Sequence, residues 1–118
     1  MQAKSVDKAE EVRQFPHGHS EIVEVGGASL QRATFEAGWR WSTDIKPIAG
    51  TDSCQVHHVG YVLSGRMKLE MDDGAAAEVG PGDVFDIPPG HDGWVLGDEE
   101  CVLLDWGPGV AGYAKSTS

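Results

Sequence analysis

Residues 58–67 read HVGYVLSGRM, and residues 80–91 read GPGDVFDIPPGH. In each stretch a short run rich in β-branched and aromatic residues stands beside glycine, and in the second also proline, a pattern typical of a strand next to a turn. The first stretch predicts a strand over 59–63 that ends in a turn at Ser64-Gly65. The second predicts a strand over 84–87 between two breaks formed by glycine and proline. Both stretches therefore indicate short strands joined by tight turns.

The same pattern of short strands and turns extends over most of the chain. Met67, Leu69 and Met71 alternate with polar residues, the period of two that is expected when one face of a strand is buried. Further strand-like runs are 21–25, 29–36, 78–79, 94–96 and 101–106, whereas 46–52 is predicted to be a loop. The chain has 16 glycines and 6 prolines, so turns are frequent. Short strands at roughly eight-to-twelve-residue spacing favour an all-β antiparallel sandwich or barrel.

The two ends of the chain are expected to lie outside this barrel. Residues 5–14 are predicted to form a short helix, because Ser5 can cap it and a weak apolar stripe follows, with Pro16 ending it. This gives an N-terminal helical arm over 1–20 and a barrel over 21–107. The C-terminal tail, 108–118, is predicted to be extended and partly mobile.

Composition excludes several classes of function. The chain has 118 residues, the usual size of one domain. Its net charge of −10 repels phosphate backbones and anionic headgroups, so neither nucleic acid nor a membrane is an expected partner. No apolar run approaches the roughly 18 residues that cross a bilayer, and residues 1–15 lack the apolar stretch of a secretory signal. The two cysteines form no disulfide framework, so a cytoplasmic location is expected.

Three side chains near strand ends are candidate metal ligands. Cys54 and His58 share one face if the backbone between them is extended, because side chains repeat every second residue, and His57 then points the other way. His91 is the last residue of the second stretch and follows the turn at Pro88-Pro89-Gly90. Residues at the ends of barrel strands converge on its mouth. One thiolate and two imidazoles suit zinc, iron, nickel or copper and leave a coordination position open.

Together the two stretches resemble the conserved motifs of the cupin superfamily, usually written G-x5-H-x-H-x3-4-E-x6-G and G-x5-P-x-G-x2-H-x3-N. The resemblance covers residues 36–107. Four of the motif glycines and prolines are in register: Gly65, Gly82, Pro88 and Gly90. The resemblance implies an antiparallel jelly-roll barrel that is commonly dimeric.

The positions that bind metal in the family hold other residue types here. His58 stands where the motif has its glutamate, and Asp52 and Cys54 stand where it has its two histidines. The histidine of the second motif falls at Gly93, two residues after His91. The usual set of three histidines and one glutamate is therefore absent, and the set inferred from the residues is Cys54, His58 and His91.

This ligand set has alternatives. His58 can instead be a histidine that hydrogen-bonds a neighbouring backbone group, and His91 can cap a loop beside Asp92. Cys54 can be a small buried apolar residue. Asp52 or Asp92 can supply a fourth, oxygen ligand, or an aspartate can orient an imidazole ring. The cofactor expected for this set is a divalent transition metal: zinc, iron, nickel or manganese.

The tryptophans suggest a binding pocket and an interface. Trp39, Trp41 and Trp94 flank the predicted barrel mouth, where their indoles can form apolar walls for a small-molecule ligand. Trp106 is expected to serve core and dimer packing. The last strand, 101–106, is apolar on both faces, and this pattern suggests that a second subunit covers its outer face in a homodimer.

Three functions fit these observations. The first is a metal-dependent cupin enzyme that acts on a small molecule in the barrel. The second is a binding or sensing module that holds its ligand without metal. The third is a barrel kept for structural purposes, with its interior filled by side chains. No pattern in the sequence singles out one reaction.

Overall fold

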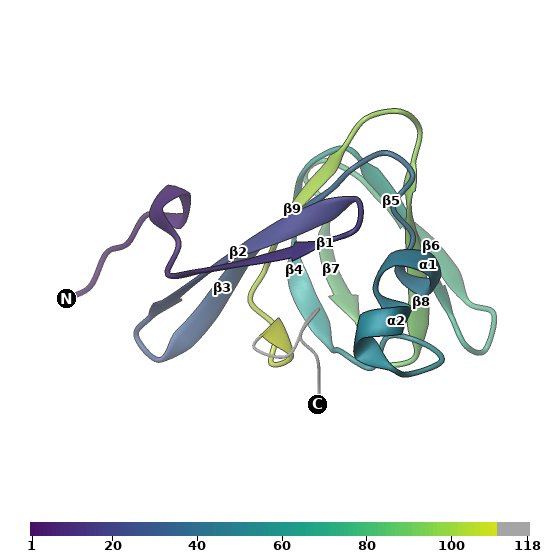
Figure 1. The fold of residues 1–118 in the computed structure, drawn as a ribbon, viewed down its shortest axis with the longest axis horizontal. Coiled ribbons are helices and arrows are strands. Elements are labelled where there is room, and N and C mark those ends of the chain that lie inside the picture. The colour runs from purple at the N-terminus through teal and green to yellow at the C-terminus, as the bar shows by residue number, and fades with distance from the viewer. Residues whose placement is uncertain (111–118) are drawn as a thin grey trace.

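The structure is a computed structural model that describes residues 1–110, and it consists of two antiparallel sheets packed face to face (Figure 1). The larger sheet has the order β1-β2-β3-β9-β4-β7 and the smaller sheet the order β6-β5-β8. The strands are β1 (Glu11–Phe15), β2 (Gly18–Val25), β3 (Ala28–Phe35), β4 (His58–Ser64), β5 (Arg66–Met71), β6 (Ala76–Val79), β7 (Val84–Ile87), β8 (His91–Leu96) and β9 (Cys101–Asp105). The predicted all-β antiparallel fold is confirmed.

From β4 onward the chain crosses repeatedly between the two sheets, at β4–β5, β6–β7, β7–β8 and β8–β9, and these crossings join the sheets into a barrel. β4 pairs with β7 and β9, whereas β5, which begins two residues after β4 ends, pairs with β6 and β8. The turn between β4 and β5 needs Gly65, which has a φ of 75° and where a Cβ would overlap the carbonyl oxygen of Glu100. This turn carries the chain from one sheet to the other.

The core lies between the sheets and follows the alternation of the strands. In β8 and β9 every second side chain is buried, so these strands have an inner face and an outer face. The buried apolar residues include Phe35, Val62, Met67, Phe85 and Leu103, which come from both sheets. Cys101, on the inner face of β9, is fully buried.

The N-terminal segment differs from the predicted helix. Only Val6–Lys8 is helical, a single 3-10 turn that Ser5 caps by accepting a hydrogen bond from the Asp7 amide. Residues 11–15 form β1, which pairs with β2, so Pro16 stands in a hairpin turn instead of ending a helix. The reason is that β1 pairs with β2 along its whole length, whereas a helix over these residues would have only a weak apolar stripe to pack against the barrel.

Three other segments differ in detail. Two short helices, α1 (Trp41–Asp44) and α2 (Lys46–Ala49), lie in the segment between β3 and β4, and α2 includes part of the predicted loop. Trp106 is 47% exposed and is not a core residue, because it follows β9 with its side chain on the outer side. Val110, at the start of the predicted tail, is buried, and residues 111–118 of that tail lie outside the described residues. Within residues 1–110 no helix has the length and hydrophobicity to span a bilayer.

Candidate metal centre and barrel cavity

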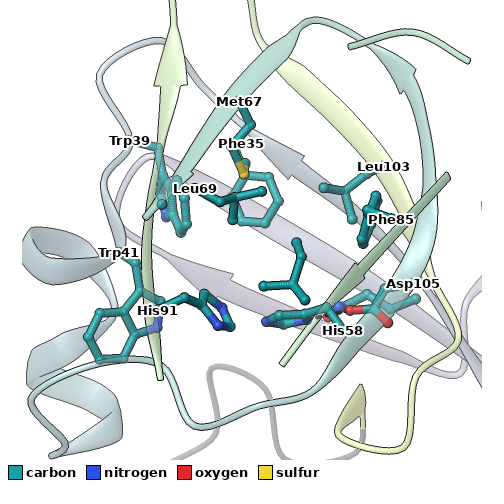
Figure 2. A pocket seen from close by; sticks show the side chains of 13 residues that line it. Phe35, Trp39, Trp41, His58, Met67, Leu69, Phe85, His91, Leu103 and Asp105 are labelled. Carbon is teal, nitrogen blue, oxygen red and sulfur yellow. Dashed lines mark hydrogen bonds and ion pairs between the residues drawn. The ribbon is translucent and has the colours of Figure 1, made fainter. Parts of the chain in front are cut away.

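A cavity opens between the two sheets, with about 420 Å³ of space free of protein atoms that includes its open mouth. Its walls are mostly apolar and aromatic, and Trp39 and Trp41 are among them, as expected (Figure 2). The polar side chains that reach the cavity are few: Gln31, His58, His91 and Asp105. Concave apolar sites with a few polar groups are typical of small-molecule binding.

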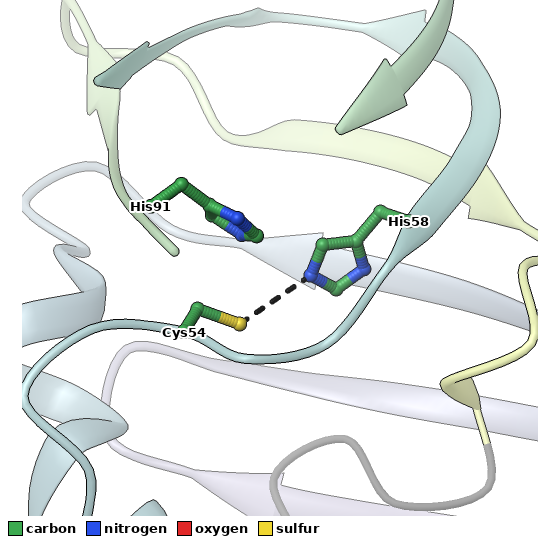
Figure 3. A group of neighbouring side chains, drawn as sticks. All are labelled: Cys54, His58 and His91. Carbon is green, nitrogen blue, oxygen red and sulfur yellow. Dashed lines mark hydrogen bonds between the residues drawn. The ribbon is translucent and has the colours of Figure 1, made fainter. Parts of the chain in front are cut away.

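Cys54, His58 and His91 come together beside this cavity (Figure 3). Their candidate ligand atoms all lie within 4.8 Å of one another, and Cys54 Sγ is 3.6 Å from His58 Nε2. The centroids of the two imidazole rings are 5.1 Å apart. Of the three residues, both histidines line the cavity, while the sulfur lies buried behind them. The structure therefore brings together the three residues that the sequence suggested as metal ligands.

Backbone pairing explains why these residues meet. Cys54 and His91 form an isolated antiparallel bridge, in which the Cys54 amide donates to the His91 carbonyl at 2.7 Å. Side chains of residues paired in this way lie on the same face. The alternation expected between Cys54 and His58 is also present: Val56 packs against the core, whereas His57 points outward and contacts Asp86.

The hydrogen bonds behind the two histidines fix which ring nitrogen faces the cluster. His91 Nδ1 lies 2.7 Å from the Pro88 carbonyl, which can only accept, so this nitrogen is the donor. His58 Nδ1 lies 2.6 Å from Asp105 Oδ2 and donates to that carboxylate. In both rings Nε2 is then left to bind a metal, the arrangement found around most metal-bound histidines.

Electrostatic interactions favour the thiolate form of Cys54, the form that binds metals. Burial by itself would raise the pKa of Cys54, but hydrogen bonds and positive charge from His58 and His91 outweigh it and lower this pKa to about 6. Burial would lower the pKa of His58, but its hydrogen bonds to Asp105 and Cys54 raise it to about 9. Without metal, near neutral pH, the cluster therefore holds a thiolate beside an imidazolium.

The cluster fits a metal ion in both chemistry and spacing. Zinc bonds of about 2.3 Å to sulfur and 2.0 Å to nitrogen place tetrahedral ligand atoms roughly 3.3–3.8 Å apart. The distance from Cys54 Sγ to His58 Nε2 falls in this range, and small side-chain rotations would bring His91 into it. Because these are three protein ligands, the fourth position would be left for a water or a ligand in the cavity.

Three of the predicted site residues are not at the cavity. On β8, His91, Gly93 and Val95 face inward, so Asp92 and Trp94 face outward. Asp92 accepts a hydrogen bond from the Ser42 amide, and Arg40 stacks on Trp94 with 4.3 Å between its Cζ and the ring centroid. Asp52 has a fully exposed side chain. The structure therefore offers neither aspartate as a fourth ligand of the cluster.

Sequence reasoning missed two residues, Asp105 and Gln31. Asp105 is 1% exposed and holds His58, and it also accepts from the Gly107 amide at 2.8 Å. Its signal was present in the sequence, because it is an acidic residue at an inward position of an otherwise apolar strand. Gln31 lies opposite Asp105 in the β3–β9 pair.

Comparisons with known proteins agree with this fold. The family model described as Cupin domain matches residues 49–107. A double-stranded β-helix protein from Klebsiella pneumoniae superposes with a TM-score of 0.61 at 18% identity, covering 100% of this chain and 99% of that one. A cupin-like protein from Thermotoga maritima gives a TM-score of 0.57 at 19% identity, covering 88% and 81%.

One of the similar structures is an enzyme with a larger chain. An oxalate decarboxylase from Lactobacillus farciminis, solved as its formate complex, gives a TM-score of 0.58 at 18% identity and covers 85% of this chain and 31% of its own. None of the curated proteins matches this chain. Likeness at such low identity concerns the fold alone.

Proposed function

This chain belongs to the cupin superfamily, and from that premise we propose that it binds a small molecule in its barrel beside a divalent metal ion held by Cys54, His58 and His91. The observation that carries the proposal is the pair of outer hydrogen bonds, from His58 to Asp105 and from His91 to the Pro88 carbonyl. These bonds leave both Nε2 atoms available on the side of the Cys54 sulfur. A histidine kept only for packing would not need this orientation.

Each residue has a separate task in this proposal. A bound ion with three protein ligands would supply a Lewis acid with one position open to the cavity. Cys54 contributes a thiolate, His58 and His91 contribute Nε2, and Asp105 keeps the His58 ring in place. The apolar walls exclude water from the same space, which strengthens polar interactions inside it.

The three ligand atoms, one sulfur and two nitrogens, also limit which metal ions suit the site. A soft thiolate with two imidazoles suits zinc, iron or nickel, whereas manganese prefers carboxylate and water oxygens. The aspartates that the sequence suggested as oxygen ligands, Asp52 and Asp92, lie away from the cluster. We therefore propose zinc, iron or nickel in preference to manganese.

Metal content tests the proposal. Protein purified without a polyhistidine tag should contain about one equivalent of metal per chain, and the His58→Ala and His91→Ala variants should lose it. His57→Ala is the matched control, because His57 is the neighbouring histidine and points away from the cluster. Absence of metal from the wild type after incubation with zinc, iron and nickel, or equal loss in the control variant, contradicts the proposal.

A binding module that works without metal is the second candidate function. It is favoured by the cavity itself, whose aromatic walls suit a small ligand with or without an ion. Chelator-treated protein distinguishes the two. Saturable quenching of tryptophan fluorescence by a small aromatic molecule, with no effect of added metal, favours this second function.

We also propose a homodimer formed through the outer face of the larger sheet. Tyr61 on β4 lies between Val84 on β7 and Leu104 on β9, and Val84 is 70% exposed. A chain with a charge of −10 associates with its own copy most readily through such an apolar patch. Light scattering should give twice the chain mass, and Val84→Lys should give the monomer. A monomeric wild type refutes the dimer.

The proposed location is the cytoplasm. Both cysteines are free and buried, and Cys54 has to stay reduced to serve as a metal ligand. Cell fractionation tests this location, and recovery of the protein from an oxidising compartment would contradict it.

A further inference from the structure

Gln31 places an unpartnered polar atom in the wall of the cavity. Its side chain is 1% exposed and lines the cavity from β3, on the same face as Ala33 and Phe35. Its Oε1 atom has no hydrogen-bond partner among the described residues. Buried polar side chains are nearly always hydrogen-bonded, because an unsatisfied one keeps the cost of its lost hydration. The amide oxygen is therefore available to a molecule that enters the cavity.

The position of Gln31 relates it to the proposed metal centre. It lies directly opposite Asp105 in the β3–β9 pair, and Asp105 holds His58. The Asp105 carboxylate accepts from His58 and from the Gly107 amide and has no proton of its own to donate, so it does not supply the missing donor. A ligand that reaches Gln31 would thus lie next to the His58 side of the cavity.

A second unpartnered group lines the same cavity. Trp39 is buried and lines the cavity, and its Nε1 donor has no acceptor within residues 1–110. In Figure 2, Trp39 and Asp105 lie on opposite sides of the cavity. The remaining walls are mostly apolar, with Phe35, Met67 and Leu69 among them. The ligand that fits has an apolar body and very few polar atoms.

We infer that the cavity recognises a small, hydroxylated aromatic or similarly flat apolar molecule, whose hydroxyl group donates a hydrogen bond to Gln31 Oε1. This inference rests on the proposed small-molecule site, and it adds the chemical class of the ligand. Phe35 on β3 and Trp39 in the loop after it supply flat surfaces for the ring of the ligand, and the centroids of their own rings are 4.3 Å apart. The amide selects the hydroxyl, because an analogue without it would leave Oε1 buried and unpaired.

Phenol and toluene form the matched probe pair, because they differ by a hydroxyl in place of a methyl group. Their affinities are measured by calorimetry on metal-loaded protein and on chelator-treated protein. We expect phenol to bind about five- to tenfold more tightly than toluene, the ratio that one net hydrogen bond provides. Equal affinities, tighter binding of toluene, or no binding of either molecule overturns the inference.

Two variants assign the preference to Gln31. Gln31→Met and Gln31→Leu keep an apolar side chain of similar size, and both should reduce the ratio of phenol to toluene affinity to about one. Because they remove an unsatisfied buried atom, neither should lower the melting temperature of the unliganded protein. Gln14→Leu, on the exposed side of β1, is the control and should keep the wild-type ratio. A wild-type ratio in folded Gln31→Met contradicts the inference.

The same experiment separates this inference from the metal proposal. A phenol preference that persists in chelator-treated protein and disappears in Gln31→Met supports the role of the amide even if the protein holds no metal. Stoichiometric metal together with equal affinities for phenol and toluene supports the metal centre and refutes the ligand class.

Discussion

Replacing Asp105 with asparagine should weaken metal binding without removing any metal ligand. In the wild type, the His58 Nδ1–H donates to Asp105 Oδ2 at 2.6 Å and leaves Nε2 for the metal. Asparagine has the same shape and can still accept from the Gly107 amide with its oxygen, but its NH₂ group then faces His58. His58 Nδ1 would have to become the acceptor, which moves the proton to Nε2, where the metal should bind.

The expected loss is 10- to 100-fold in affinity, the usual effect of removing the carboxylate partner of a metal-bound histidine, or about 1.4–2.7 kcal/mol. The pKa of His58 should also fall from about 9, because burial persists while the Asp105 charge is lost. Competition between the metal-free protein and a chromophoric chelator for zinc measures the affinity.

Asp86→Asn is the matched control for this substitution. Asp86 contacts His57 Nε2, so it is also a histidine partner, but this pair lies on the outer surface. Asp86→Asn should leave the affinity for zinc unchanged. If Asp105→Asn binds zinc as tightly as the wild type, or if both substitutions weaken binding equally, the assigned role of Asp105 is wrong.

Three further predictions follow from the cluster and the barrel. Zinc affinity should rise about tenfold per pH unit between about pH 6 and 9 and then level off, because His58, with a pKa of about 9, must lose a proton to bind zinc. An affinity independent of pH in this range would contradict the role of His58 as a ligand. In metal-free protein the ultraviolet absorbance of the Cys54 thiolate should appear as the pH rises through about 6, and it should be absent from Cys54→Ser at that pH. Gly60→Ala should lower the free energy of unfolding in urea by about 3 kcal/mol, because its Cβ would overlap the carbonyl oxygen of Leu104. Gly82→Ala, whose Cβ meets no neighbour, should lower it by only about 1 kcal/mol, the cost of its φ of 89°. Equal losses in the two variants would contradict the close packing at Gly60.

The strands were predictable because their signals are local. In β5 the alternation of Met67 and Leu69 with polar residues indicates that one face of the strand is buried, and Gly65 indicates the turn before the strand. The N-terminal helix was mispredicted because the partner of β1 decides its structure. Residues 11–15 become a strand through pairing with β2, and a weak helical stripe in the sequence carries no information about that pairing.

The three candidate ligands of the site were predictable from the sequence, and their surroundings were not. Alternation placed Cys54 and His58 on one face, but the bridge between Cys54 and His91 joins segments far apart in the chain. Trp94 was misplaced because the strand was predicted to begin at residue 94. Since β8 begins at His91, an odd spacing of three residues turns Trp94 to the outer face. The partners of the cluster, Asp105 and the Pro88 carbonyl, depend on the three-dimensional arrangement of β9 and the turn before β8.

X-ray absorption at the zinc edge of the metal-loaded protein tests the proposed metal centre most directly. A metal held by Cys54, His58 and His91 should show one sulfur at about 2.3 Å and two imidazole nitrogens at about 2.0 Å, with the remaining position filled by a light atom. The sulfur shell should be lost in Cys54→Ser. A spectrum with nitrogen and oxygen neighbours only, or one unchanged by that substitution, would show that these three side chains do not hold the ion.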